Sequence, residues 1–364
     1  MPLDVKRLRV LRELAERGTV AATAEALSFT PSAVSQQLSA LEREAGVVLL
    51  EREGRRLALT DAGRTLVAHA DAVLAQLERA EADLHAGNRE ISGSLRVAAF
   101  SSFARSMLPR ATAAMLAYPH LDVHVRDAEP QDSEPLLRLG ELDVVIAQRF
   151  PYVPREFGPA FHVVELFDDP LHLATGPGHH DVPARFGDLA GRPWVAGHPG
   201  TSCHEVVVHA CHAAGHEPRI VGYSNDFAVV SALVAQGVGV ALIPRIAHDQ
   251  APPEVRLRPL DPPLSRQVLA VVRAGAEERP AVAAFLRELQ RAAGCPDRSG
   301  CPPRRSVMAL HRTGPRRPSC CSRGPAPHRP CARGARPAAG RRPRRRRTGR
   351  AVTVRAGRSR FVAR

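Results

Sequence analysis

The 364-residue chain is predicted to be an α/β protein built from four successive segments. Residues 1–60 show three short helix patterns and then a basic hairpin, and residues 61–87 show one long helix pattern. Residues 92–294 alternate strand and helix patterns, as α/β domains do. Residues 295–364 hold 21 Arg, one acidic residue and almost no Leu or Ile, so they are predicted to form a disordered Arg-rich tail.

The charge of the chain is unevenly distributed. The formal net charge is +14, but the part before residue 295 holds 30 basic and 36 acidic residues. That part is therefore mildly acidic, and the tail carries the excess positive charge. The N-terminus has no apolar run after its charges, and the apolar stretch Phe227–Pro244 is interrupted by Gln236 and glycines. We therefore expect a cytoplasmic protein without a secretory signal or a membrane span.

Two short helices are predicted before residue 30. The first, Val5–Glu16, places Leu8 and Leu11 on one side, and Gly18 ends it. The second, Val20–Leu27, is short and rich in alanine, so a neighbouring helix can approach it closely.

A third helix is predicted over TPSAVSQQLSALEREAG, from Thr30 to Gly46, with Thr30 as N-cap and Pro31 at the first helical position. At about 100° per residue its apolar side chains share one face, and the opposite face carries Ser and Gln. These uncharged hydrogen-bonding groups suit base edges and phosphate oxygens in a major groove, whereas a merely solvated face more often carries Glu and Lys. The residues predicted to contact DNA here are Thr30, Ser32, Ala33, Ser35, Gln36, Gln37, Ser39 and Arg43.

A basic hairpin is predicted over Val47–Leu59, with Gly54 at its turn. Arg52, Arg55 and Arg56 cluster at its tip, where they can reach phosphates or the minor groove. Three helices followed by such a hairpin form a winged helix-turn-helix. The alternative for these arginines is an ordinary solvated surface.

The long helix over residues 61–87 carries a heptad-like seam. Its apolar positions are spaced 4, 3, 4, 3 and 4, and they are Leu66, Ala70, Val73, Leu77, Ala80 and Leu84. We expect this seam to pair with the same helix of a second copy. The alternative is packing against the protein's own body.

The stretch from Thr19 to Gly63 resembles the N-terminal signature of the LysR-type transcriptional regulators, and its central part is AATAEALSFTPSAVSQQLSALEREAGVVLLEREGRRLALTDAG. The matching features are the Ala-rich second helix, the S-x-x-L-S cadence, the Leu-Glu before the glycine, and the Leu-Thr-Asp-Ala-Gly that enters the long helix. The chain departs from the family at Pro31-Ser32 and at Gln36, where the family often has a Gln-Pro pair and an Arg. These positions concern base readout, so the operator sequence is not carried over.

The resemblance implies a DNA-binding transcription factor that acts as a dimer or tetramer and is associated with the nucleoid. Its implied partners are double-stranded promoter DNA, a small-molecule effector, further copies of itself and RNA polymerase. The resemblance extends more weakly to Gly294 and implies a two-lobed α/β effector domain similar to periplasmic solute-binding proteins.

The local patterns over residues 92–294 agree with such a domain. Strands are predicted at Ser94–Phe100, Leu121–Val125, Leu142–Ala147 and Gln267–Val272, a helix from Ser101 toward Pro109, a second lobe over Phe161–Leu264, and a closing helix at Arg279–Ala293. In the QGVGVALIP stretch at 236–244, a helix is expected to end at glycine before a strand begins.

An effector cleft between the lobes is implied by the same resemblance. Carried over residue by residue, its candidates are Ser101, Ser102, Phe103, Gln148, Arg149, Thr201, Ser202, Asn225 and Phe227. Ser101 and Ser102 at a helix N-terminus could hold a carboxylate, which favours an anionic effector. The alternative for these serines is plain helix capping.

No catalytic, metal-binding or cofactor-binding motif is recognised. In HEVVVHACH, His204 and His209 are five residues apart, whereas a zinc-protease helix needs histidines four apart on one face. The GVGVA glycines precede a strand, unlike a dinucleotide fingerprint. We therefore expect no enzyme, cofactor or metal. The alternatives are a solute-binding or enzymatic α/β protein, and a DNA-organising protein that binds non-specifically through its arginine tail.

Overall fold

The computed structural model describes residues 3–53, 56–86, 90–153 and 155–294. The predicted tail over residues 295–364 and two residues of the predicted wing tip, Gly54 and Arg55, lie outside the described residues. Within the described ranges, no helix combines the length and apolarity needed to cross a membrane.

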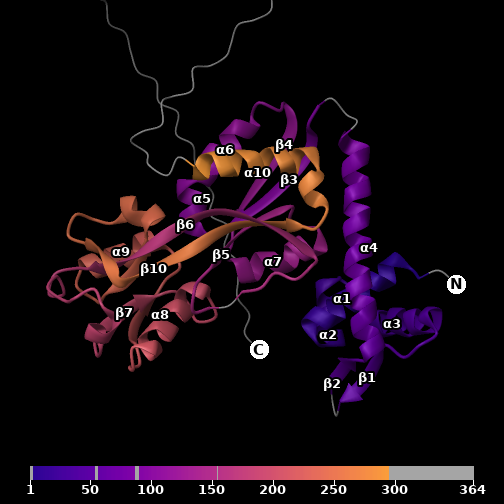
Figure 1. Cartoon of the computed structure of the whole chain (residues 1–364), viewed down its shortest axis with the longest axis horizontal. Coiled ribbons are helices and arrows are strands. Elements are labelled where there is room, and N and C mark those ends of the chain that lie inside the picture. Colours follow the sequence, from indigo (N-terminus) through magenta and orange to yellow (C-terminus); the bar gives the residue numbers. More distant parts are fainter. Residues whose placement is uncertain (1–2, 54–55, 87–89, 154, 295–364) are drawn as a thin grey trace, which may run out of the picture. The chain divides into compact units, whose positions relative to one another are not determined.

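The N-terminal part is the predicted winged helix-turn-helix (Figure 1). Its elements are α1 (Val5–Arg17), α2 (Val20–Ala26), α3 (Pro31–Ala45), β1 (Leu50–Glu53) and β2 (Arg56–Leu59). Leu11, Val34 and Leu41 have no exposed surface and lie in the core of this unit. The three helices pack together because each turns an apolar face inward.

The third helix begins and ends at the residues predicted from the sequence. The Thr30 side chain accepts a hydrogen bond from the Ala33 N–H, and Pro31 occupies the first turn, where no N–H is required. Gly46 ends the helix with φ +68°, a left-handed conformation that glycine adopts without strain.

The hairpin is attached to both helices that flank it. Glu42 Oε1 of α3 accepts hydrogen bonds from the backbone N–H groups of Leu49 (3.0 Å) and Leu50 (3.2 Å). A Cβ at Gly63, near the start of α4, would lie 2.2 Å from the Leu49 carbonyl oxygen, so only glycine permits this approach. The orientation of the wing is thus determined by α3 and by α4 (Asp61–Ala86).

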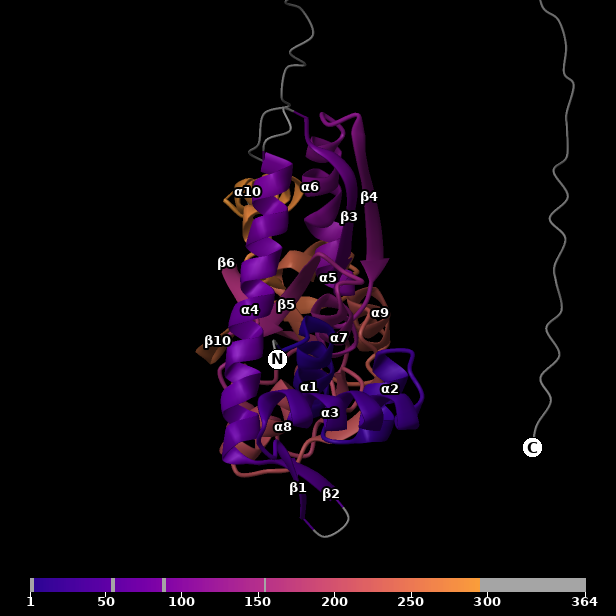
Figure 2. The same cartoon turned by 90° about the vertical axis from the view of Figure 1, so that its right-hand side faces the viewer.

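The predicted dimer seam on α4 is divided between two environments. Ala70 is fully buried in the winged-helix core and Leu66 packs against that core. Val73 and Leu77 are each 40% exposed, and Leu84 is 80% exposed. The prediction that Ala70 faces a second copy is therefore wrong, because α1 and α3 need the start of α4 to complete their own core. Figure 2 shows α4 passing beside both the winged helices and the effector domain.

The predicted effector domain is built on a six-stranded sheet in the order β4-β3-β5-β10-β6-β9, with a separate two-stranded sheet β7-β8. The strands are β3 (Ser92–Ala99), β4 (His120–Asp127), β5 (Val144–Arg149), β6 (Phe161–Thr175), β7 (Pro193–Ala196), β8 (Arg219–Tyr223), β9 (Ala241–Pro244) and β10 (Arg256–Arg273). The α-helices are α5 (Ser101–Ser106), α6 (Leu108–Met115), α7 (Pro130–Leu139), α8 (Ser202–Ala213), α9 (Phe227–Ala235) and α10 (Pro280–Ala293). Short 3-10 turns are η1 (Phe186–Leu189), η2 (Arg245–Gln250) and η3 (Ala276–Glu278).

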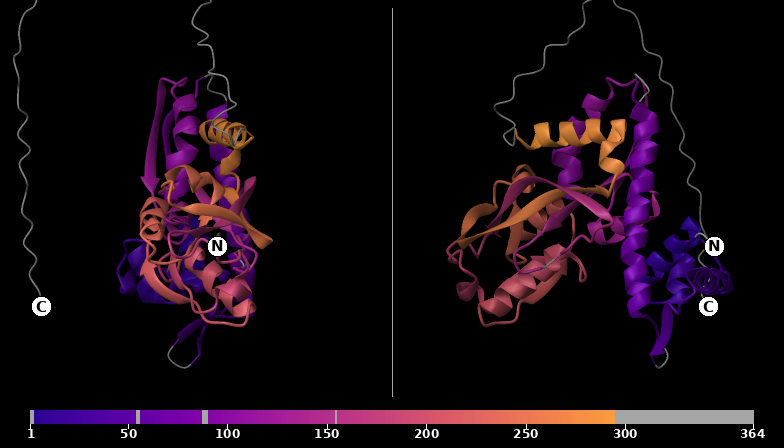
Figure 3. Two further views of the ribbon diagram at one scale, coloured as in Figure 1. Left: turned by 90° about the vertical axis from the view of Figure 1, so that its left-hand side faces the viewer. Right: turned by 45° about the vertical axis from the view of Figure 1, so that its right-hand side comes forward.

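Two long antiparallel strands, β6 and β10, pass through both lobes (Figure 3). In the first lobe they share a core with β3, β5 and α10, and in the second lobe they pack beneath Trp194 of β7 and Val206 of α8. The expected return strand Gln267–Val272 is therefore only the end of an 18-residue strand. Prolines hid the remainder, because proline in a run normally argues against a strand. Here they fall at the register shift between Pro259 and Leu264.

The helix expected from Ser101 toward Pro109 is two helices. α5 ends at Ser106 and α6 begins at Leu108, with Met107 between them at φ −112°. Pro109 cannot donate a backbone hydrogen bond, and it lies in the first turn of α6, where none is needed.

Candidate functional site

The outward face of α3 has the composition predicted for a DNA-reading helix. Val34, Leu38 and Leu41 are buried, and the residues exposed on the other side are Ser32, Ser35, Gln36, Ser39 and Arg43. A core on one side and short uncharged hydrogen-bonding groups on the other give a helix that can lie against base edges.

Several side chains on this face are held by local hydrogen bonds. Ser35 Oγ donates to the Pro31 carbonyl oxygen at 3.0 Å, and Arg43 Nε donates to the Ser39 carbonyl oxygen at 3.3 Å. Thr30 Oγ1 lies 3.0 Å from Ser32 Oγ. The helix surface is therefore partly organised before any DNA is present.

Two residues predicted to contact DNA are less available. Gln37 Oε1 accepts a hydrogen bond from Arg7 Nε of α1 at 3.1 Å, so its side chain links two helices. Ala33 is half-buried, as is Gln37. Of the wing arginines, Arg52 is exposed on β1, Arg56 lies on β2, and Arg55 falls outside the described residues.

Between the two lobes lies a buried arginine that the sequence analysis did not single out. Arg266 of β10 is 1% exposed. Its Nε lies 3.0 Å and its Nη2 2.9 Å from Asp169 Oδ2 of β6. Its Nη1 donates to Gln148 Oε1 at 2.6 Å, and its Nη2 donates to Ser102 Oγ at 3.0 Å. We call these four residues the Arg266 network.

The Arg266 network gathers several of the predicted effector residues. Ser102 and Gln148 belong to it directly, and the Phe227 ring lies 6.0 Å from the Arg266 guanidinium carbon. Gln148 Nε2 also donates to Cys203 Sγ at 3.6 Å, which brings in the start of α8. Thr201 and Ser202 immediately precede that cysteine, and Thr201 caps α8.

Other predicted effector residues have different roles. Phe103 is 1% exposed and stacks on Phe167 in the core of the first lobe. Arg149 donates to Gln267 Oε1 at 2.9 Å, away from the network, because successive strand residues point to opposite faces. Neither Phe103 nor Arg149 therefore belongs to the Arg266 network, and their assignment to the cleft stays a prediction.

Two further predicted residues are engaged by neighbours within the chain. The Ser101 hydroxyl donates to the Asp127 carboxylate at 3.1 Å, and Asn225 Oδ1 accepts from the His198 N–H at 3.0 Å. Ser101 is thus already paired with an anion belonging to the protein itself.

An acidic side chain beside the network has no hydrogen-bond partner among the described residues. Glu129 lies at the start of α7 but does not cap it, and its Oε2 is buried and unpaired. Burial raises the pKa of Glu129 to about 7, although the positive charge of Arg266 acts in the opposite direction. Both forms of this carboxyl group are therefore populated at neutral pH.

The two cysteines of the described part are held as thiols. Burial raises the pKa of Cys203 to about 11 and that of Cys211 to about 12. Because the thiolate is the reactive form, these environments do not favour thiol chemistry at neutral pH.

The residues that the sequence analysis missed left a weak signal. Arg266 lies two residues before the apolar run Val268–Val272, and Asp169 lies in the middle of β6. A charge that must enter a buried strand needs an opposite charge beside it. The pairing of Arg266 with Asp169 follows from the pairing of β10 with β6, which brings together residues 97 positions apart in the chain.

A winged helix-turn-helix joined by a long helix to a two-lobed α/β domain defines a class of ligand-responsive DNA-binding regulators. Two family models match this chain: "Bacterial regulatory helix-turn-helix protein, lysR family" over residues 5–64, and "LysR substrate binding domain" over residues 88–294. The chain belongs to the LysR family of transcriptional regulators. It is a DNA-binding transcription factor that responds to an effector.

Individual relatives agree with this assignment. The chain is 29% identical over 297 residues to the probable HTH-type transcriptional regulator LrrA of Synechococcus elongatus, covering 80% of this chain and 98% of the relative. It is 30% identical over 285 residues to the malonate utilization transcriptional regulator of Klebsiella pneumoniae, covering 77% and 92%. Among solved structures, a full-length OxyR variant from Pseudomonas aeruginosa matches its fold with a TM-score of 0.52 at 23% identity, covering 80% and 95%.

Proposed function

We propose that the exposed face of α3 reads the bases of a promoter while the wing contacts the adjacent backbone. The observation that carries this proposal is the concentration of uncharged hydrogen-bonding groups on that face, opposite a fully buried apolar face. Gln36 lies on this face, is exposed, and can form paired hydrogen bonds with an adenine edge.

The test is the affinity of Gln36→Ala for the DNA upstream of its own gene and for random DNA, measured across a range of salt concentrations. We expect preference for the upstream DNA to fall by about 1–3 kcal/mol while non-specific affinity is retained. Gln76→Ala is the matched control, because Gln76 is exposed on α4, away from α3. Equal loss on both DNAs would show that Gln36 does not read bases.

A second observation separates this function from non-specific DNA organisation. The excess positive charge lies in the tail over residues 295–364, whereas the α3 face lies in a winged helix that completes its own core. A chain ending at Gly294 should therefore keep its preference for the upstream DNA and lose part of its salt-dependent non-specific affinity. Loss of all DNA binding in the shortened chain would favour the tail as the DNA-binding element.

We propose further that two copies pair through the exposed apolar side of α4. Val73, Leu77, Ala80 and Leu84 remain exposed there, and their spacing is that of a heptad seam. Such a pair would present two α3 helices to two half-sites. Leu77→Asp should weaken self-association at least tenfold in sedimentation equilibrium, whereas Gln76→Ala should not. An unchanged association constant for Leu77→Asp would locate the interface elsewhere.

The effector is proposed to bind between the lobes beside Ser102, Gln148 and Phe227, near the start of α8. An anionic group would compete with Asp169 for Arg266, and the Ser101 hydroxyl already donates to Asp127. These contacts favour an effector that offers hydrogen-bond donors over one that depends on a free cation in the protein.

A further inference from the structure

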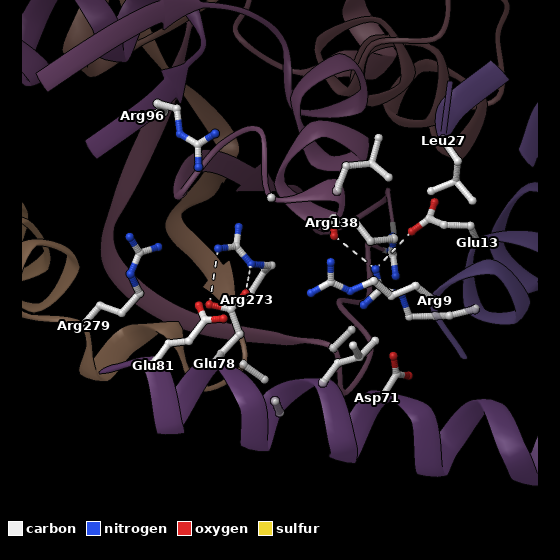
Figure 4. A pocket seen from close by; sticks show the side chains of 17 residues that line it. Arg9, Glu13, Leu27, Asp71, Glu78, Glu81, Arg96, Arg138, Arg273 and Arg279 are labelled. Atoms are coloured by element: carbon white, nitrogen blue, oxygen red, sulfur yellow. Dashed lines mark hydrogen bonds and ion pairs between the residues drawn. The ribbon is translucent and has the colours of Figure 1, made fainter. Parts of the chain in front are cut away.

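The first lobe of the effector domain presents a charged surface to α1 and α4 of its own chain. Two contacts lie on either side of a cavity of about 390 Å³, and arginines line both ends of that cavity (Figure 4). The residues that line the cavity come mainly from α1, α4, the end of α7 and the end of β10.

The first contact is made by Arg273, the last residue of β10. Its Nε lies 2.5 Å from Glu78 Oε1 of α4. Its Nη1 donates to two carbonyl oxygens, that of Leu137 in the last turn of α7 (3.1 Å) and that of Leu142 in the connection from α7 to β5 (2.7 Å). The Arg273 and Glu78 side chains are only 12% and 16% exposed, so this is a partly buried, charge-assisted contact rather than a surface ion pair.

Backbone approaches backbone directly beside this ion pair. Gly275 has φ +92°, and a Cβ there would lie 2.3 Å from the Ala75 carbonyl oxygen of α4. The Gly275 N–H is held by Glu277 Oε2 at 2.6 Å. Any side chain at this position would push the linker helix away from the lobe.

The second contact joins α7 to α1. Arg138 Nη2 lies 3.3 Å from Glu16 Oε1, and the Arg138 carbonyl oxygen accepts a hydrogen bond from Arg12 Nη2 at 3.1 Å. Glu13 has no exposed surface and pairs with Arg12 at 3.1 Å. Helix α1, which precedes α2 and α3, is thus attached to the effector domain as well.

The space between the two contacts leaves polar atoms uncompensated. Arg12 Nε and Asp71 Oδ1 are buried without a hydrogen-bond partner among the described residues. Burial lowers the pKa of Arg12 and raises that of Asp71. These buried groups without partners disfavour the docking of the effector domain on α1 and α4. They therefore reduce the free-energy difference between the docked and the undocked arrangement of the chain.

Strand β10, which ends at this surface, also carries Arg266 and so passes through the Arg266 network between the two lobes, which we call the interlobe site. Arg266 and Arg273 both lie on β10, seven residues apart, or about 23 Å along an extended strand. Between them β10 is paired on both edges, with β5 over residues 267–271 and with β6 throughout, apart from one register shift between Val268 and Leu269. The paired strand thus joins Arg266 to Arg273 directly through the backbone, and a displacement of Arg266 can reach the end of β10.

We propose that the effector domain docks the linker helix of its own chain through a clasp, formed by Arg273, Gly275 and Arg138, and that rearrangement of the Arg266 network loosens or tightens this clasp. The coupling rests on the proposed effector role of the interlobe site.

The clasp is tested on the full chain by hydrogen–deuterium exchange of α4. Glu78→Gln should raise exchange over residues 71–82 about tenfold, the size expected when a partly buried charge-assisted hydrogen bond is lost. Asp83→Asn is the matched control, because Asp83 is an exposed acid on the same helix and does not line the cavity. Equal exchange in Glu78→Gln and the unsubstituted protein would overturn the clasp.

The coupling is tested by Ser102→Ala, which removes one acceptor of Arg266 without a change in charge. It should raise exchange over residues 71–82 several-fold. Ser106→Ala, on the same short helix, should not raise this exchange, because among the described residues its hydroxyl donates to the Ser102 carbonyl oxygen and makes no bond to Arg266. Unchanged hydrogen–deuterium exchange in α4 of the Ser102→Ala variant would overturn the coupling. All four variants should keep their preference for upstream DNA, so failure of the DNA-reading proposal would appear separately, in Gln36→Ala.

Discussion

The exposed face of α3 and the buried Arg266 network were built in different ways. Every residue of the α3 face comes from one helix of 15 residues, and its hydrogen bonds are local. The Arg266 network joins β10 to α5 across 164 residues of chain and to β6 across 97. The first surface keeps its polar groups available for a partner, whereas the second satisfies them internally before any ligand arrives.

This difference predicts where substitutions act. Groups exposed on α3 are solvated in the free protein, so their removal should change DNA binding and leave folding unaffected. Groups in the Arg266 network are desolvated, so the loss of one leaves another buried without its partner. Four predictions test this contrast, in order of decreasing effect.

Arg266→Met should give the largest effect, because it leaves the Asp169 carboxylate buried at 1% exposure without its counter-ion and with one remaining hydrogen bond, from the Ile246 N–H. We expect the free energy of unfolding to fall by about 3–5 kcal/mol in urea titrations. The double variant Arg266→Met/Asp169→Leu should recover most of that loss, since the charge is then removed together with its partner. If the single variant is as stable as the unsubstituted protein, the network is not a closed, desolvated unit.

Glu129→Gln should remove a pH dependence of stability. The pKa of this carboxyl group is raised from 4.5 to about 7 by burial, so the folded protein favours its protonated form. Its stabilising effect is full below pH 4.5 and is lost as the pH rises through 7, by about 3 kcal/mol. The difference in unfolding free energy between Glu129→Gln and the unsubstituted protein should therefore grow with pH. Parallel profiles from pH 4.5 to pH 8 would contradict the assigned burial.

Arg52→Ala should have a smaller effect, confined to DNA binding. Arg52 is exposed on β1 of the wing. Loss of one phosphate contact should weaken binding to upstream and random DNA alike and reduce the slope of log affinity against log salt by about 1. Arg79→Ala on α4 provides a control for the loss of an exposed arginine. An unchanged slope would remove Arg52 from the phosphate contacts.

Gln36→Ala should have the smallest effect on folding. Its side chain is exposed and Ala favours helix, so the free energy of unfolding should change by less than about 0.5 kcal/mol. Thermal unfolding followed by circular dichroism measures this directly. A larger loss would mean that the α3 face is part of the fold, and the contrast with the Arg266 network would fail.

The sequence by itself determined those features that depend on residues close together in the chain. The start and end of α3 follow from Thr30, Pro31 and Gly46, and its inward and outward faces follow from the 3.6-residue period. The family signature lies in the same region.

Only the tertiary structure decided those features that depend on contacts between residues far apart in the chain. Ala70 and Val73 both belong to the predicted seam, yet one completes the winged-helix core and the other is exposed. Gln148 and Arg149 are neighbours in sequence, yet only Gln148 meets Arg266, because the pleat of β5 turns them to opposite faces. Burial of a charge such as Arg266 depends on which strand supplies its partner, and strand order is a property of the whole sheet.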